Sequence, residues 1–135
     1  MGNQHKAAIY IRANTGCSLR EQEEQIRRFI AAKELSVFDV YRDSGYSGND
    51  FNRPKIQRLF ADMKEGKFQY IVVWRLDRLS RNNKDILTLI DNELEPRKIK
   101  LLISSCDIES STPEGKMFVA LQGIFAEYEQ AISGS

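Results

Sequence analysis

The sequence predicts an α/β domain with a mainly parallel sheet of four to five strands, flanked by helices and ending in a long C-terminal helix. Short apolar runs, typical of buried strands, alternate along the chain with longer segments in which apolar residues recur at helical spacing. Clusters of Gly, Pro and polar residues separate the two kinds of segment. The length of 135 residues, of which 41% are hydrophobic and 29% charged, fits one globular domain over residues 1–135.

The predicted strands are short and mostly apolar. The run from Tyr70 to Trp74 is apolar throughout, as expected when helices cover both faces of a strand. The run from Val37 to Tyr41 has alternating character, which is typical of a strand with two different faces. The other two predicted strands are residues 7–11 and 98–104.

Four segments have the periodicity of amphipathic helices, and local signals mark where two of them begin. Ser18 and Glu21 form a capping-box pattern, in which each side chain binds a free backbone donor at the other residue. Pro54 suits a first helical position, and residues 43–52 before it are rich in Gly, Ser, Asn and Asp and are predicted to be irregular. The predicted helices span about residues 18–33, 54–65, 82–94 and 112–132.

Charge and cysteine content exclude several functions. The net charge of +1 lacks the basic excess of a free-standing nucleic-acid binder, so another region would have to hold any DNA. Cys17, Cys106 and His5 have no metal-ligand spacing, and no phosphate-binding glycine loop of the GxGxxG or GxxxxGK[ST] type follows a strand. We expect no metal, no cofactor, no membrane segment and a location in the cytoplasm.

Loops that leave the carboxyl ends of parallel strands converge on one crevice, and five charged residues are predicted to meet there. They are Arg12 after the first strand, Arg53 before the second helix, and Asp77, Arg78 and Arg81 after the third strand. Clustered arginines repel one another, so the cluster indicates an anion, and the paired donors of arginine match the oxygens of a phosphodiester. For Arg78 and Arg81 the alternative is a solvated charge or an ion pair with Asp77.

Six segments occur in an order that resembles one protein family. In chain order they are Arg12-Ala13-Asn14-Thr15, Asp43-Ser44-Gly45-Tyr46-Ser47-Gly48, Arg53-Pro54, Trp74 to Asn82, Gly115 to Phe118, and Phe125 to Glu129. Together they resemble the catalytic domain of the serine site-specific DNA recombinases, the resolvase and invertase family. The Gly-Tyr-Ser-Gly and Arg-Pro segments are similar to the large type found in phages and transposons.

The resemblance implies an enzyme that cleaves and rejoins DNA through a protein-phosphoserine intermediate, without a cofactor. It implies that the four arginines hold the phosphate and that Asp77 helps the released hydroxyl to gain its proton. Gln22 matches a polar position that supports the site, and the alternative is an exposed helix glutamine. Asp43 matches the loop before Arg53, where the alternative is a simple turn.

The resemblance also identifies a substitution at the position of the nucleophilic serine, which here is Asn14. An amide is a poor nucleophile and does not form the phosphoester. Thr15, Cys17 and Ser18 lie nearby, but each has a simpler explanation, as the family threonine, a small turn residue and the helix cap. We therefore expect this chain to be inactive in cleavage. The alternative is a non-catalytic oligomerisation or regulatory module of the same fold.

Two partners follow from the resemblance. DNA is expected to bind mainly through a C-terminal region that follows the last helix in the family and is absent from these 135 residues. Self-association as a dimer or tetramer is expected through the last helix, with Met117, Phe118, Leu121 and Phe125 at the interface. The alternative is that the last helix packs these side chains against its own sheet.

Overall fold

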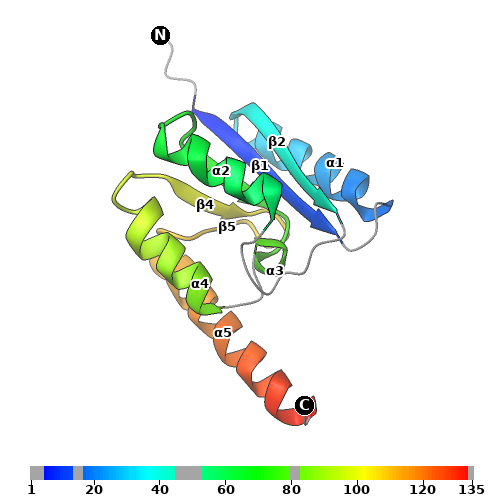
Figure 1. Ribbon diagram of the computed structural model, residues 1–135, viewed down its shortest axis with the longest axis vertical. Coiled ribbons are helices and arrows are strands. Elements are labelled where there is room, and N and C mark those ends of the chain that lie inside the picture. The colour runs from blue at the N-terminus through cyan, green and yellow to red at the C-terminus, as the bar shows by residue number, and fades with distance from the viewer. Residues whose placement is uncertain (1–4, 14–16, 45–52, 80–82, 134–135) are drawn as a thin grey trace.

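The computed structural model describes residues 5–13, 17–44, 53–79 and 83–133, which form a central sheet with helices on both faces (Figure 1). The order of the five strands is β2-β1-β3-β4-β5. Strands β1 to β4 are parallel, and β5 runs antiparallel to β4. The strands are β1 (Lys6–Ala13), β2 (Ser36–Ser44), β3 (Tyr70–Val73), β4 (Lys100–Ile103) and β5 (Ile108–Glu109). The predicted α/β class and mainly parallel sheet are confirmed.

The predicted helices are present, with three differences. The first helix begins at Cys17, so Ser18 lies inside the first turn and the capping position predicted for it is wrong. A one-turn helix, α3, follows β3, and the third predicted helix changes from α-helical to π-helical geometry half-way along. The bounds are α1 (Cys17–Ala32), α2 (Pro54–Lys64), α3 (Leu76–Leu79), α4 (Asn83–Thr88), η1 (Leu89–Leu94) and α5 (Pro113–Ser133).

Each face of the sheet has its own apolar core, because side chains alternate between the two faces of a strand. On one face Ile9 and Ile11 pack with Ile26 and Ile30 of α1. On the other face the neighbouring residue Tyr10 belongs to a larger core that also includes apolar side chains of α2, α4, η1 and α5. The two polar ends of β1 and β2 lie together, since Arg12 pairs with Asp43 in the strand register. This carboxyl edge of the sheet is where the charged residues were predicted to meet.

The start of α5 is held tightly against the sheet at Gly115. A Cβ atom at this position would lie 1.8 Å from the carbonyl oxygen of Glu109 in β5, so only glycine fits. The hydroxyl of Thr112 donates to the same carbonyl and accepts from the Gly115 amide, both at 2.9 Å. From this anchor α5 extends away from the sheet towards the C-terminus (Figure 1).

Candidate functional site

Arg12 and Gln22 meet at the end of β1. Arg12 is fully buried, and Gln22 on α1 is only 2% exposed. The Gln22 Nε2 atom donates to the Arg12 carbonyl at 3.2 Å, and the buried Gln22 Oε1 atom has no hydrogen-bond partner among the described residues. Gln22 is therefore not the exposed helix glutamine of the alternative interpretation, whereas Gln25 is exposed. The contact links α1 to the backbone of the penultimate residue of β1.

Arg53 is buried at the start of α2 and joins two other parts of the chain. It is 1% exposed, and its Nη1 atom donates to the Tyr10 hydroxyl at 2.7 Å. Its Nη2 atom donates to the Leu79 carbonyl at 2.5 Å, at the end of α3. A planar guanidinium suits this position because it directs several donors in fixed directions at once. Arg53 thus ties α2 to both β1 and α3.

Asp43 completes a buried polar chain through Tyr10. Its Oδ2 atom accepts from the Tyr10 hydroxyl at 2.9 Å and from the Ile56 amide at 3.1 Å, and its Oδ1 atom accepts from the Lys55 amide at 3.0 Å. The residue before α2 makes no side-chain cap, so a carboxylate from β2 satisfies the free amides instead. The prediction of an irregular segment from residue 43 is wrong at its first two residues, because Asp43 and Ser44 lie in β2.

The Tyr10 hydroxyl connects the anion and the cation of this chain. Burial raises the pKa of Tyr10, the nearby Arg53 charge lowers it, and the bond to Asp43 raises it again, so the net direction is upward. The hydroxyl is therefore protonated at neutral pH, and it donates to Asp43 while it accepts from Arg53. The sequence analysis missed Tyr10, since an aromatic residue in an apolar strand has the pattern of a core residue. Its hydroxyl was the only feature in the sequence that could have indicated a polar role for this residue.

The remaining predicted site residues are placed in part. Asp77 and Arg78 lie on α3, which packs against β1 and whose last carbonyl binds Arg53. The structure describes the backbone of these two residues but not their side chains. Asn14 and Arg81 lie outside the described residues, as do Thr15, Ser47 and Gly48. The structure thus brings Arg12, Gln22, Arg53 and the α3 backbone to one edge of the sheet.

Three arginines outside the family motifs, Arg27, Arg28 and Arg42, are exposed. Arg28 is exposed, and Arg27 and Arg42 both bind Glu23, at 2.9 Å and 2.6 Å. Burial acts to raise the pKa of Glu23, but the hydrogen bonds from these two arginines outweigh burial and lower the pKa. Surface pairs of this kind contribute little to stability.

The apolar side chains of α5 divide into two groups. Met117, Leu121 and Ile124 are 61%, 45% and 60% exposed and recur at helical spacing, so they form one apolar stripe. Phe118 is partly buried against the core, so for this residue the alternative of packing within the domain is the observed one. The side chain of Phe125 lies outside the described part. Among the described side chains of α5, these three are the large apolar ones that the domain leaves exposed.

Three other features bear on ligands and surroundings. Among the described residues, no three His, Cys, Asp or Glu side chains are grouped as metal ligands would be. None of the described helices has both the length and the apolar character that crossing a bilayer needs. Cys106 is exposed and carries a free thiol.

Comparison with known proteins identifies the family. The family model of the resolvase N-terminal domain matches residues 7–135, nearly the whole chain. The chain belongs to the resolvase and invertase family of serine recombinases. The resemblance seen in the sequence is thereby confirmed, and the members of this family are enzymes that cleave and rejoin DNA strands.

Relatives of this recombinase domain are longer proteins. A putative DNA recombinase of Bacillus subtilis is 34% identical over an alignment of 130 residues that covers 92% of this chain and 25% of the relative. The transposon Tn552 resolvase of Staphylococcus aureus is 33% identical over 124 residues, which are 90% of this chain and 58% of the resolvase. The chain therefore spans between a quarter and about three fifths of these two relatives.

Solved recombinase structures share the fold. The N-terminal catalytic domain of TP901-1 integrase superposes with a TM-score of 0.79 at 32% identity, covering 95% of this chain and 98% of that domain. A resolvase-family site-specific recombinase from Streptococcus pneumoniae superposes with a TM-score of 0.74 at 26% identity, covering 95% and 89% of the two chains. The sheet and helices described above are thus those of a serine recombinase catalytic domain.

Proposed function

We propose that this domain is the catalytic part of a site-specific recombinase and that Arg12, Arg53, Arg78 and Arg81 hold the phosphodiester that is cut. The observation that carries the proposal is that Arg12 and Arg53, both buried, lie at one edge of the sheet next to α3, the helix that contains Asp77 and Arg78. Arginine donors stabilise the extra negative charge of a five-coordinate phosphorus without a metal. Gln22 supports this site by holding the end of β1.

The reaction needs a hydroxyl at position 14. A serine there would bond its oxygen to phosphorus while the bond from phosphorus to the 3′ oxygen breaks, and Asp77 would help that oxygen to gain a proton. Asn14 supplies no such hydroxyl. We propose that the chain retains the phosphate site but lacks the cleavage step.

The burial of the two arginines adds a condition to the proposal. Arg12 is 0% exposed and Arg53 is 1% exposed, so a phosphate reaches their guanidinium groups only after the cover over them has moved. DNA binding would then include a local rearrangement at this edge of the sheet. Burying a charge is costly, so two buried cations at one edge support an anion site over the rival proposal of an assembly module without chemistry, even though Arg53 also ties α2 to β1 and α3.

Binding of inorganic phosphate tests the site without any chemistry. We expect the chain to bind phosphate, and nuclear magnetic resonance of the arginine side chains measures this binding. Arg53→Lys should weaken the binding by about tenfold or more, because a lysine does not reproduce the paired donors of arginine. Arg27→Lys, an exposed arginine elsewhere, is the matched control and should bind as the parent does. Absence of binding in the parent chain would favour the assembly module.

We further propose that the domain self-associates through the apolar stripe of α5 and that a region outside these residues provides most of the DNA contact. The exposure of Met117, Leu121 and Ile124 supports the first part. The net charge of +1 and the greater length of the relatives support the second part. The Gly-Tyr-Ser-Gly and Arg-Pro segments support the large recombinase type.

Sedimentation velocity at rising protein concentration tests the association. We expect the parent chain to shift from monomer to dimer or tetramer, and Leu121→Glu to stay monomeric because a carboxylate cannot be buried unpaired in an apolar interface. Ala31→Glu, at an exposed position on α1, should associate as the parent does. A parent chain that is monomeric at high concentration would contradict the proposed interface.

A further inference from the structure

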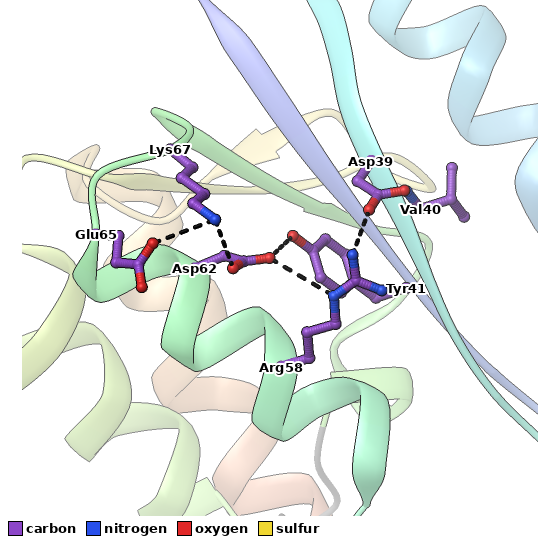
Figure 2. A network of polar contacts seen from close by, with 7 residues as sticks. All are labelled: Asp39, Val40, Tyr41, Arg58, Asp62, Glu65 and Lys67. Atoms are coloured by element: carbon purple, nitrogen blue, oxygen red, sulfur yellow. Dashed lines mark hydrogen bonds and ion pairs between the residues drawn. The ribbon is translucent and has the colours of Figure 1, made fainter.

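Two side chains of β2 hold α2 at two separate points. Tyr41 and Asp43 lie two residues apart, so they share one face of the strand, and both are buried. Asp43 binds the first amides of α2, at Lys55 and Ile56. The Tyr41 hydroxyl donates to Asp62 Oδ2 at 2.6 Å, near the other end of the helix (Figure 2).

The spacing of the two contacts determines what they restrain. Asp62 follows Ile56 by six residues, which is about 9 Å along a helix axis. The apolar side of α2 also packs on the sheet, through Ile56, Leu59 and Met63, but apolar contacts have no preferred direction. Hydrogen bonds at two separate points do have a direction, so they oppose both sliding and rotation of the helix.

Neighbouring charges support the contact at Asp62 (Figure 2). Lys67 lies 3.4 Å and Arg58 lies 3.9 Å from the carboxylate, and Arg58 also binds Asp39 of β2 at 3.2 Å. The hydrogen bond from Tyr41 lowers the pKa of Asp62. Burial and that same bond raise the pKa of Tyr41. At neutral pH the bond therefore joins a neutral hydroxyl to an ionised carboxylate, which is a strong kind of hydrogen bond.

Arg53 lies directly before α2, so any movement of the helix moves the backbone of Arg53 with it. Its guanidinium binds Tyr10 and Leu79 across distances of 2.7 Å and 2.5 Å, which leave little tolerance for displacement. A displacement of about 1 Å at a reacting group costs up to 100-fold in rate in enzymes. If Arg53 holds the phosphate, binding of the phosphate therefore depends on the orientation of α2.

We propose that Tyr41 and Asp62 are positioning residues for Arg53, because their hydrogen bond fixes the far end of the helix that begins next to this arginine. The inference rests on the proposed function in one respect, namely that Arg53 binds the phosphodiester. Neither residue touches the phosphate in this proposal. They act on Arg53 by fixing the position of α2 against β2.

Inorganic phosphate and the Arg53 Nε–H resonance of this chain test the proposal. Tyr41→Phe removes the hydroxyl, and Asp62→Leu removes its acceptor. Each is expected to shift the Arg53 resonance and to weaken phosphate binding by about 3- to 10-fold. Asp62→Asn retains an oxygen acceptor for Tyr41 and should restore both measurements towards the parent values. Tyr41→Phe combined with Asp62→Leu should weaken binding no further than either change alone.

Two controls separate positioning from loss of stability. Lys67→Met removes an ion pair of Asp62 but leaves the hydroxyl bond, and both measurements should stay at the parent values. Ile26→Val lowers stability from the core on the other face of the sheet, and it should also leave the Arg53 resonance unchanged.

The outcomes distinguish this inference from the proposed function. If the parent chain binds no phosphate, the proposed function fails, and the Arg53 resonance alone then decides the positioning role. An unshifted resonance in Tyr41→Phe overturns the inference whatever the parent binds. A shifted resonance with parental phosphate affinity also overturns it, because the position of Arg53 would then not matter for the anion.

Discussion

Replacement of Asn14 by Ser is expected to change a protein that forms no covalent link with DNA into one that does. The proposed site retains its arginines, its aspartate and Gln22, so the missing group is one hydroxyl. Loss of the attacking side chain in enzymes that form covalent intermediates typically costs about 10⁴-fold or more in rate. The measurement is the yield of a protein–DNA adduct on denaturing gels, from a recombinase that contains this chain and DNA that bears its recombination site.

Two further variants sharpen the test of Asn14. Asn14→Ala removes the amide without adding a hydroxyl, so it should form no adduct, like the parent. Asn14→Ser combined with Arg53→Lys should form far less adduct than Asn14→Ser alone, because the phosphate would lose its paired donors. An adduct formed with Asn14 in place and mapped to Thr15 or Ser18 would contradict the proposal, since a neighbouring hydroxyl would then have replaced the serine.

Replacement of Asp43 by Ala is expected to lower the free energy of unfolding by about 3 to 5 kcal/mol. The change removes the acceptor of three donors at once, the buried Tyr10 hydroxyl and Ile56 amide and the partly buried Lys55 amide. It also leaves the buried charge of Arg53 without the anion at the end of the polar chain. Urea denaturation measures this loss. If the dependence of the unfolding free energy on urea concentration has the same slope in both proteins, the shift of the midpoint reports a difference in stability.

Asp39 provides the matched control for Asp43 because both aspartates lie on β2. Asp39 forms an exposed ion pair with Arg58 at 3.2 Å, and exposed pairs contribute about 1 kcal/mol or less. Asp39→Ala should therefore lower stability far less than Asp43→Ala. Asp43→Asn keeps one oxygen acceptor and should fall between the two. Equal losses for Asp39→Ala and Asp43→Ala would contradict the role given to the buried polar chain.

The fold was largely predictable because each core imposes a local period on the sequence. Residues 70–74 are apolar throughout since both faces of β3 are covered, and the segments of α1 and α2 repeat their apolar residues at helical spacing. The short elements were not predictable in this way. Helix α3 has four residues and β5 has two, which is too few for any period to be visible.

The motif residues of the candidate site were predictable from the sequence, but the residues that hold them in place were not. Arg12 and Arg53 follow from their places at the ends of predicted elements, and both are at the carboxyl edge of the sheet. Gln22 remained ambiguous because a helix glutamine is usually exposed, and only the path of β1 beneath α1 buries it. Tyr10 was missed because the neighbouring sequence does not show whether the hydroxyl of a buried tyrosine takes part in a hydrogen-bond network.

The sequence by itself determined the order of the longer strands and helices, the family, and the presence of an amide where a nucleophilic hydroxyl is expected. These are properties of neighbouring residues and of ordered motifs. Only the tertiary structure decided which polar groups are buried together. Tyr10 bonds Asp43 across 33 residues and Arg53 across 43, and Arg53 bonds Leu79 across 26. Contacts at such separations exist because β1 lies between β2 and β3 in the sheet, and no local pattern encodes that neighbourhood.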